Sequence, residues 1–204
     1  MKDGSFEWIG GHVALDFTNT VTWRRWGLDR ERLESYADLL KWSAQAGPLE
    51  TAVLVALRKL ARDRPRAAGA AHRDALRARG ELHALFVAQA TGQRTPASVM
   101  ASLSRRSRGV MSHIALRSLA DRVTVGWDDV LRLDRPLWPV LKAAIELVSS
   151  AELGRLGLCA NPDCGWVFLD QSRKGNRRWC SMRECGSRAK ARAYYHRRHG
   201  GRHL

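Results

Sequence analysis

The stretch Cys159-Ala-Asn-Pro-Asp-Cys164, followed after fifteen residues by Cys180-Ser-Met-Arg-Glu-Cys185, contains all four cysteines of this 204-residue chain. In a reducing compartment, clustered cysteines indicate a metal site before they indicate disulfides. Four thiolates satisfy the tetrahedral preference of Zn2+ and leave no position for a substrate water, so the pattern favours a structural zinc site. Two alternatives remain, namely four unligated core thiols and an iron–sulfur cluster, which also uses four cysteines.

The segment between the two cysteine pairs is long enough to fold a hairpin and return. Residues 166–170 predict a strand, residues 172–175 a loop, and residues 177–179 the returning strand. We interpret the aromatic side chains of this segment as a small core beside the metal, in preference to stacking partners for nucleic-acid bases. These aromatic residues are Trp166, Phe168 and Trp179.

A basic, alanine-containing segment follows the last cysteine. Ser187 is a good helix N-cap, the alanines favour helix, and Gly200-Gly201 would end it. Clustered positive charges on one short helix repel each other, so we expect an anionic partner; a solvated basic tail is the alternative. The candidate nucleic-acid contacts are Arg173, Lys174, Arg177, Arg178, Arg188, Lys190, Arg192, Arg197 and Arg198.

The charge of the chain points the same way. The formal net charge is +15, and the segment from Arg155 to Leu204 contains twelve Lys and Arg residues but only three acidic residues. This excess implies DNA, RNA or, less readily, an acidic membrane surface as the partner. The hydrophobic content of 45% is that of a globular protein. Because the sequence shows neither a secretory signal nor a membrane-spanning run, we expect a cytoplasmic protein.

The rest of the chain is expected to be mostly helical. An opening segment, residues 6–21, is rich in strand formers, with a turn or bulge at Gly10-Gly11. Alternation predicts a hairpin from residues 110–116 and 122–127, turning at 118–121. Apolar residues at helical spacing predict helices over residues 29–46, 49–62, 71–90, 96–107 and 135–153.

Residues 1–154 show no catalytic signature. Asp16 and Asn19 lie in the first expected strand and are candidates for a ligand pocket, although turn or capping roles are more common. The histidines of this region are dispersed, and there is no phosphate-binding loop, so we predict no catalytic residues and no enzyme. The numerous tryptophans are interpreted as core or interface residues, with an aromatic-lined pocket for a small-molecule effector as the alternative.

Two motifs resemble known bacterial families. Cys159-x4-Cys164-Gly-Trp-x-Phe-x-Asp-x-Ser-Arg, followed by Arg177-Arg-Trp-Cys-Ser-Met-x-x-Cys-Gly-Ser-Arg-x-Lys190, resembles the CGNR zinc finger. Gly10-Gly-His-Val-Ala-Leu-Asp-Phe-Thr-Asn-Thr20, with Tyr36-Ala-Asp-Leu-Leu40, resembles the ABATE domain that precedes that finger. The resemblance implies a stress-related transcription regulator with two domains, residues 1–154 for sensing or dimerisation and residues 155–204 on DNA. Ser187 stands where the family name has Asn, and both residues cap helices well.

We therefore expect a mainly α chain with small antiparallel β elements (α+β). A helical N-terminal domain with a β-hairpin should precede a treble-clef or ribbon-like zinc module, built from a β-hairpin and a basic helix. The functional expectation is a transcription regulator bound to double-stranded DNA. The alternatives are an RNA- or ribosome-binding module and a protein-interaction adaptor with a purely structural zinc. The sequence leaves the DNA site, the effector, the sign of regulation and the oligomeric state open, a homodimer included.

Overall fold

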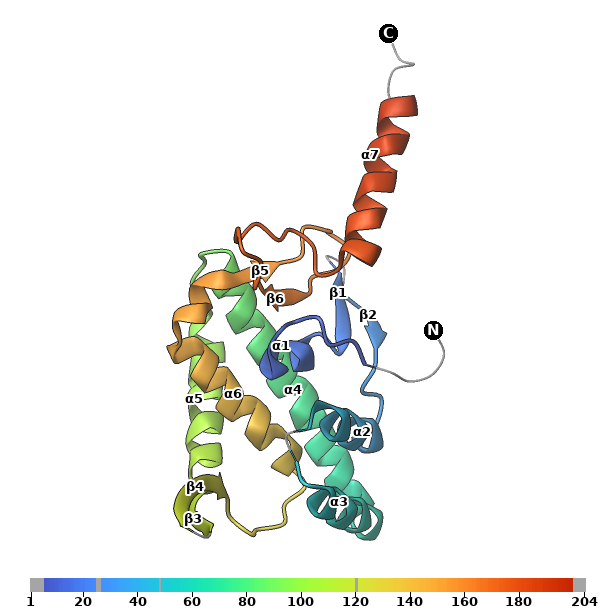
Figure 1. Cartoon of the computed structure of the whole chain (residues 1–204). Coiled ribbons are helices and arrows are strands. Elements are labelled where there is room, and N and C mark those ends of the chain that lie inside the picture. The colour runs from blue at the N-terminus through green and yellow to red at the C-terminus, as the bar shows by residue number, and fades with distance from the viewer. Residues whose placement is uncertain (1–5, 25–26, 48, 120, 200–204) are drawn as a thin grey trace.

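The computed structural model describes residues 6–24, 27–47, 49–119 and 121–199. A helical body carries one helix that stands off at its C-terminal end (Figure 1). The helices are α1 (Val13–Thr18), α2 (Tyr36–Ala46), α3 (Thr51–Asp63), α4 (Pro65–Ala90), α5 (Ala97–Met111), α6 (Trp138–Ser149) and α7 (Ser187–His199). Shorter helical turns are η1 (Arg135–Leu137), η2 (Ala151–Arg155) and η3 (Met182–Gly186).

The strands form two-stranded antiparallel sheets, so the α+β class predicted from the sequence is confirmed. The pairs are β1 (Val21–Arg24) with β2 (Gly27–Glu31), β3 (Ile114–Leu119) with β4 (Arg122–Trp127), and β5 (Leu156–Leu158) with β6 (Val167–Leu169). No helix in the described ranges is both long and apolar enough to cross a membrane.

Helix α4 is the central element of the body. It contacts α1, α2, α3 and α5 and also strands β5 and β6. Ala75, Ala78, Leu82 and Phe86 repeat every three or four residues along one face and are buried. The helix begins at Pro65, within the gap between the helices predicted over residues 49–62 and 71–90. The predicted start at residue 71 was wrong because proline suits the first helical position, whose N–H has no intrahelical partner.

The expected first strand is a short helix. Residues 13–18 form α1, and His12 caps it because its Nδ1 accepts a hydrogen bond from the backbone N–H of Ala14 at 3.3 Å. Five of its six residues are buried. A helix buried on all sides has no polar face, so its sequence carries no helical periodicity and can be mistaken for a strand. The strand in this region begins only at Val21.

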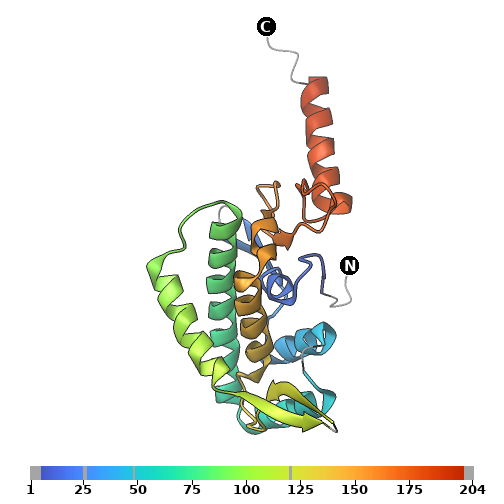
Figure 2. The same ribbon diagram turned by 60° about the vertical axis from the view of Figure 1, so that its left-hand side comes forward.

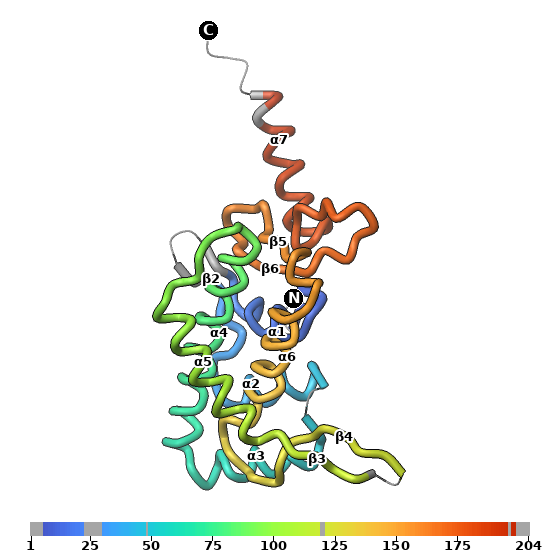
Figure 3. Tube along the Cα trace, turned by 90° about the vertical axis from the view of Figure 1, so that its left-hand side faces the viewer, coloured from blue at the N-terminus to red at the C-terminus, as the bar shows by residue number. Residues whose placement is uncertain are grey.

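The hairpin near residue 115 is confirmed, with a later start. Helix α5 continues to Met111, and Val110 packs in the core as part of it. Strand β3 therefore begins at Ile114, and its last pair joins Leu119 to Arg122. The hairpin projects from the end of the body opposite α7 (Figure 3). The long helix expected over residues 135–153 is divided into η1, α6 and η2.

The zinc module pairs its strands differently from the prediction. Strand β6 pairs with β5, which precedes the first cysteine, and residues 177–179 form no strand. The backbone N–H of Cys159 donates to the carbonyl of Trp166 at 2.9 Å, which continues this ladder to the metal site. The hairpin thus encloses the first cysteine pair, and the chain then passes through η3 directly into α7. The predicted helix end at Gly200-Gly201 lies outside the described residues.

Candidate metal centre and nucleic-acid surface

The four cysteines meet at one buried point. Their Sγ atoms all lie within 4.8 Å of one another, and each residue is at most 5% exposed. The Sγ atoms of Cys164 and Cys180 are 3.5 Å apart, and those of Cys180 and Cys185 are 3.6 Å apart. A tetrahedral ZnS4 centre with Zn–S bonds of about 2.3 Å has sulfurs roughly 3.8 Å apart. The cluster therefore matches the size of a zinc site.

The thiols of Cys159, Cys164 and Cys180 influence one another's ionisation. Bonds from the thiols of Cys164 and Cys180 hold the pKa of Cys159 far below its usual value. The same interactions with Cys159 raise the pKa values of Cys164 and Cys180. A thiolate at Cys159 thus opposes the ionisation of Cys164 and Cys180, and a cation bound at this site would favour the thiolate forms. With four protein ligands the site is closed, so the role it supports is structural.

The loop between the first two cysteines supports the sulfurs and holds α7. Asn161 is only 1% exposed, and its Nδ2 donates to the Sγ of Cys185 at 3.4 Å. The backbone N–H of Cys180 donates to the Sγ of Cys159 at 3.4 Å. Arg192 of α7 donates through Nη2 to the Oδ1 of Asn161 at 2.7 Å, and its Nη1 lies 3.3 Å from Asp163. The base of α7 is therefore tied to the metal loop.

A second set of contacts joins the zinc module to the start of the chain. Asn19 forms two hydrogen bonds with Val167 of β6, because its Nδ2 donates to the carbonyl at 2.8 Å and its Oδ1 accepts from the N–H at 3.2 Å. The N–H of Leu169 donates to the carbonyl of Gly10 at 2.7 Å, and the indole Nε1 of Trp166 donates to the carbonyl of Val21 at 2.7 Å. We call these residues, Gly10, Asn19, Val21, Trp166, Val167 and Leu169, the junction.

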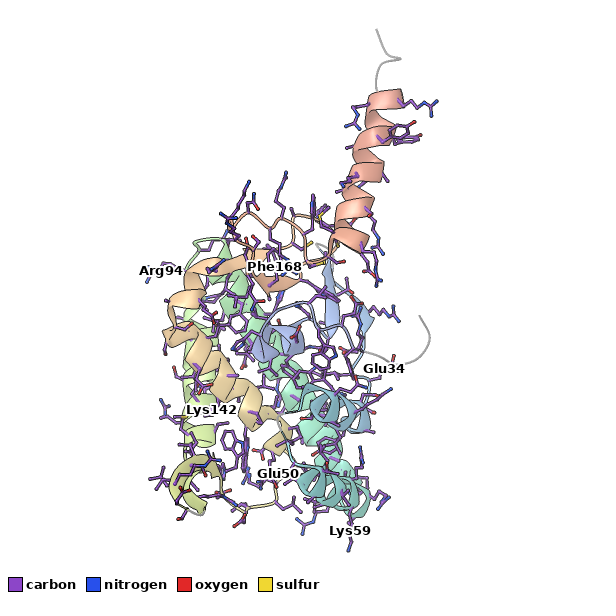
Figure 4. All side chains as sticks on the ribbon, viewed as in Figure 1. Glu34, Glu50, Lys59, Arg94, Lys142 and Phe168 are labelled. Atoms are coloured by element: carbon purple, nitrogen blue, oxygen red, sulfur yellow. The ribbon has the colours of Figure 1, made fainter. Side chains whose placement is uncertain are left out.

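The junction is also part of the main hydrophobic core. Val167 and Leu169 pack with the buried residues of the helical body, whereas Phe168 on the other face packs with the cysteines. Figure 4 labels Phe168 at the β5–β6 hairpin, where the zinc module meets the top of the helical body. Strand β6 therefore joins the two cores through its alternating side chains.

Asp16 holds the glycine loop that forms one side of the junction. Its Oδ1 accepts a hydrogen bond from the N–H of Gly10 at 2.7 Å. A Cβ at Gly10 would lie 2.9 Å from this oxygen and 3.0 Å from the backbone nitrogen of Asp16, so the approach requires glycine. Burial raises the pKa of Asp16 to about 6, despite hydrogen bonds from Gly10 and Ile9 that lower it. The sequence favoured turn or capping roles for Asp16 and Asn19 over a ligand pocket, and both side chains form internal hydrogen bonds.

Two of the candidate nucleic-acid contacts have hydrogen-bond partners outside α7, while Arg198 donates through Nη1 to the Oη of Tyr194 within the helix at 2.8 Å. Arg177 donates to the backbone carbonyl of Ile9 at 2.9 Å and to that of Cys180 at 2.5 Å. Its guanidinium lies 4.2 Å from the centroid of the Phe168 ring. Arg192 is the second, through Asn161 and Asp163. These two arginines hold the zinc module and α7 in place.

The other candidate contacts have exposed side chains. Three lie in the loop before the third cysteine, and four project from α7; they are Arg173, Lys174, Arg178, Arg188, Lys190, Arg197 and Arg198. Figure 4 shows nitrogen-tipped side chains leaving α7 in several directions, and Figure 2 shows that the helix stands clear of the body along most of its length. The structure thus brings the loop and the base of α7 to the same end of the molecule.

The aromatic residues of the module follow the core interpretation. Trp166 is 4% exposed and Phe168 is fully buried, so neither ring face is open to a nucleobase. Trp179 is partly buried, and the guanidinium of Arg178 lies 5.5 Å from its ring centroid. The exposed aromatic residues of this end are Tyr194 and Tyr195 on α7.

Ser187 is not the N-cap of α7. Its φ of −65° and ψ of −41° are helical, and its Oγ donates to the carbonyl of Met182 at 3.1 Å. Ser181 is the capping residue, because its side chain accepts from the N–H of Glu184. The prediction was wrong because η3 leads into α7 without a break and moves the cap back to Ser181.

Sequence reasoning missed the junction. The polar residues of the Gly10-to-Thr20 motif sit within an apolar run, and buried polar groups in native proteins nearly always have partners. This signal could have suggested that Asn19 pairs with backbone elsewhere. It could not have identified Val167, which is 148 residues away in sequence.

Comparisons with known proteins agree with this architecture. Residues 11–151 match the ABATE family, whose description is "Putative stress-induced transcription regulator", and residues 155–198 match the CGNR zinc finger. A search of curated proteins found no match. The zinc-finger match and the converging thiols together identify Zn2+ as the cofactor. Zinc held by Cys159, Cys164, Cys180 and Cys185 would supply folding free energy to the module.

Proposed function

The chain belongs to the ABATE family, and from this premise we propose that it is a transcription regulator that binds double-stranded DNA through α7 and the loop at residues 172–178. The family descriptions name a regulator and a zinc finger and mention no enzymatic activity. Residues 155–198 are assigned to DNA contact. In this proposal residues 11–151 hold the zinc module in place and sense a ligand or stress signal, and they would also form the interface if the protein is a homodimer.

The observation that carries the proposal is the exposure of α7. The helix has thirteen residues and is therefore about 20 Å long. It contains five Lys and Arg residues and no acid. Only Arg192 among these five has an acidic partner in the described structure. An α-helix fits the major groove of B-DNA, where arginine and lysine side chains reach both phosphates and guanine edges.

The zinc module gives this helix a fixed base. Asn161 and Asp163 hold Arg192 one turn into the helix. The loop with Arg173, Lys174 and Arg178 is connected to the same metal site through Cys180. Phosphate contacts by this loop would orient the protein, and base contacts would come from α7.

A salt titration of DNA binding tests the proposal. Full-length zinc-loaded protein is titrated by fluorescence anisotropy against duplexes selected from a random library. The triple variant Lys190→Ala, Arg197→Ala, Arg198→Ala should weaken binding and reduce the slope of log K against log [salt] by about 3. The matched control, Arg58→Ala, Lys59→Ala, Arg62→Ala, removes the same charge from α3 and should leave the slope unchanged. Equal losses for the two triple variants would show that only net charge matters and would contradict the proposal.

Competition separates DNA from the alternatives raised by the sequence. The burial of Trp166 removes one proposed stacking platform for unpaired bases. Structured RNA should therefore compete less well than the selected duplex at equal salt. Preferential binding of RNA, or selection of no duplex at all, would overturn the DNA assignment in favour of an RNA-binding module or an adaptor.

A further inference from the structure

A groove runs between α5 and α6 and has α4 as its floor. Its volume is about 440 Å3, within the range of roughly 300–1,000 Å3 typical of small-molecule sites. Its lining is mainly aliphatic, from Leu82 and Leu85 of α4, Leu103 of α5, and Leu141 and Ile145 of α6. The helices α5 and α6 lie side by side in the body (Figure 1).

The groove has one cation at its edge. Arg108 lines it together with the hydroxyl-bearing Ser104 and Ser107, and no acidic residue among the described ones lines it. Within the described part of the chain, Arg108 takes part in no ion pair and no side-chain hydrogen bond. A free guanidinium beside an apolar channel is complementary to a ligand with an aliphatic chain and an anionic head.

A neighbouring pocket shows the contrast. It has a volume of about 340 Å3 and is lined by Arg106 and Arg132. Arg106 is paired with Asp74 and Glu81, and Arg132 is paired with Asp134. Both arginines of that pocket already have carboxylate partners, so neither is left unpaired for a ligand. The groove at Arg108, in contrast, has a cation without an acidic partner among the described residues.

The length of the groove sets the length of the chain it would hold. Met100 and Met111 are the first and last residues of α5 that line it, and they are 44% and 48% exposed. Met111 lies eleven positions after Met100 in the helix, which corresponds to about 16 Å. Methionine side chains adapt their shape to a bound apolar group. The apolar surface that water now contacts would be covered by an extended aliphatic chain of medium length.

We propose that this groove binds a medium-length aliphatic carboxylate, with the chain along the leucine floor and the carboxylate paired with Arg108. The guanidinium can donate two parallel hydrogen bonds to the carboxylate, and the hydroxyls of Ser104 and Ser107 provide further donors. The inference goes beyond DNA binding and holds whether or not α7 contacts DNA.

Calorimetry with decanoate tests the proposal on the full-length zinc-loaded protein. One equivalent of decanoate should bind saturably below its micelle concentration, and decanol and decyltrimethylammonium should bind at least about tenfold more weakly. Arg108→Gln should weaken decanoate binding about tenfold and leave decanol binding unchanged. Arg105→Gln, an exposed arginine of the same helix outside the groove, should have no effect.

A second variant tests the groove itself. Val148→Glu places a carboxylate on the groove wall at a side chain that is already 38% exposed, so the fold should persist by circular dichroism while decanoate binding is lost. Equal affinities for decanoate and decanol, or unchanged affinity in Arg108→Gln, would overturn the proposal. So would a wild-type dimer in sedimentation velocity that Val148→Glu converts to monomer, because the face would then be an interface between copies.

Discussion

Arginine has opposite roles in two parts of the zinc module, the region around Cys180, which we call the base, and helix α7. In the base, the guanidinium of Arg177 lies against Phe168 and donates to backbone carbonyls. On α7, Arg188 and Arg197 are exposed. An arginine with internal partners contributes to stability, whereas an exposed one acquires a role only when a partner molecule arrives. The +15 charge of the chain therefore overstates the charge available to nucleic acid.

The largest effect is expected when a zinc ligand is removed from the base of the zinc module. Cys180→Ser should abolish stoichiometric zinc binding, and structural zinc contributes on the order of 10 kcal/mol to the folding of small modules. Because β6 packs in the main core, the loss should also lower the unfolding temperature of the helical body. Elemental analysis measures the zinc content, thermal unfolding by circular dichroism measures the unfolding temperature, and hydrogen exchange measures protection within the module, with the exposed Arg183→Ala as the control. A variant that loses zinc yet retains protection in residues 156–186 would contradict the structural role of the metal.

The next effect separates the junction from the metal. Asn19→Ala leaves the buried N–H and carbonyl of Val167 without their side-chain partner. Urea denaturation should show a loss of about 2–4 kcal/mol in the free energy of unfolding, while zinc content stays at one equivalent. Asn176→Ala, on the exposed loop, should leave stability within about 0.5 kcal/mol of the wild type. Loss of zinc in Asn19→Ala would show that the junction and the metal site fold as one unit.

A pH-dependent effect is expected at Asp16. Its pKa is about 6 in the folded protein, above the value of 3.8 for the free side chain. The folded state therefore binds this proton more tightly, and stability from Asp16 is present at low pH and lost as pH rises through about 4 to 6. Asp16→Asn removes this titration, so its stability relative to the wild type should increase by about 2–3 kcal/mol across that window.

The measurement for Asp16 is a set of urea unfolding curves from pH 4 to 8. Asp63→Asn, an exposed carboxylate at the end of α3, controls for the removal of a charge. A difference between Asp16→Asn and the wild type that stays constant with pH would mean that the pKa of Asp16 is the same in the folded and unfolded states, which would contradict the prediction.

The smallest effect sharpens the comparison between the two kinds of arginine. Arg177→Ala should cost about 1–2 kcal/mol of stability, because the carbonyls of Ile9 and Cys180 lose a donor. Arg178→Ala, at the adjacent exposed position, should cost less than about 0.5 kcal/mol and should instead weaken DNA binding. Thermal unfolding measures the stability of both variants, and fluorescence anisotropy measures their affinity for DNA. Identical profiles would remove the distinction between structural and exposed arginines.

Local sequence patterns correctly predicted the helices and the hairpin whose formation depends mainly on residues close together in the sequence. Helices α3 and α5 and the β3–β4 hairpin follow from apolar spacing and from Gly and Pro positions, because both signals act over a few residues. The helix predicted over residues 29–46 was right only from Tyr36, where α2 begins, because its first residues belong to strand β2, which pairs with β1. The errors occurred where local signals are ambiguous. Helix α1 is buried on all sides, and Pro65 begins a helix as readily as it ends one.

The sequence by itself determined the metal site and the basic end. Four cysteines in two equally spaced pairs favour one tetrahedral ion whatever the rest of the fold is, because ligand geometry is set by the ion. Only the tertiary structure decided that β6 pairs with β5, that Asn19 holds Val167, and that Arg177 and Arg192 have internal partners. Those contacts join residues far apart in the chain, and each depends on which polar groups remain unpaired once the core has formed.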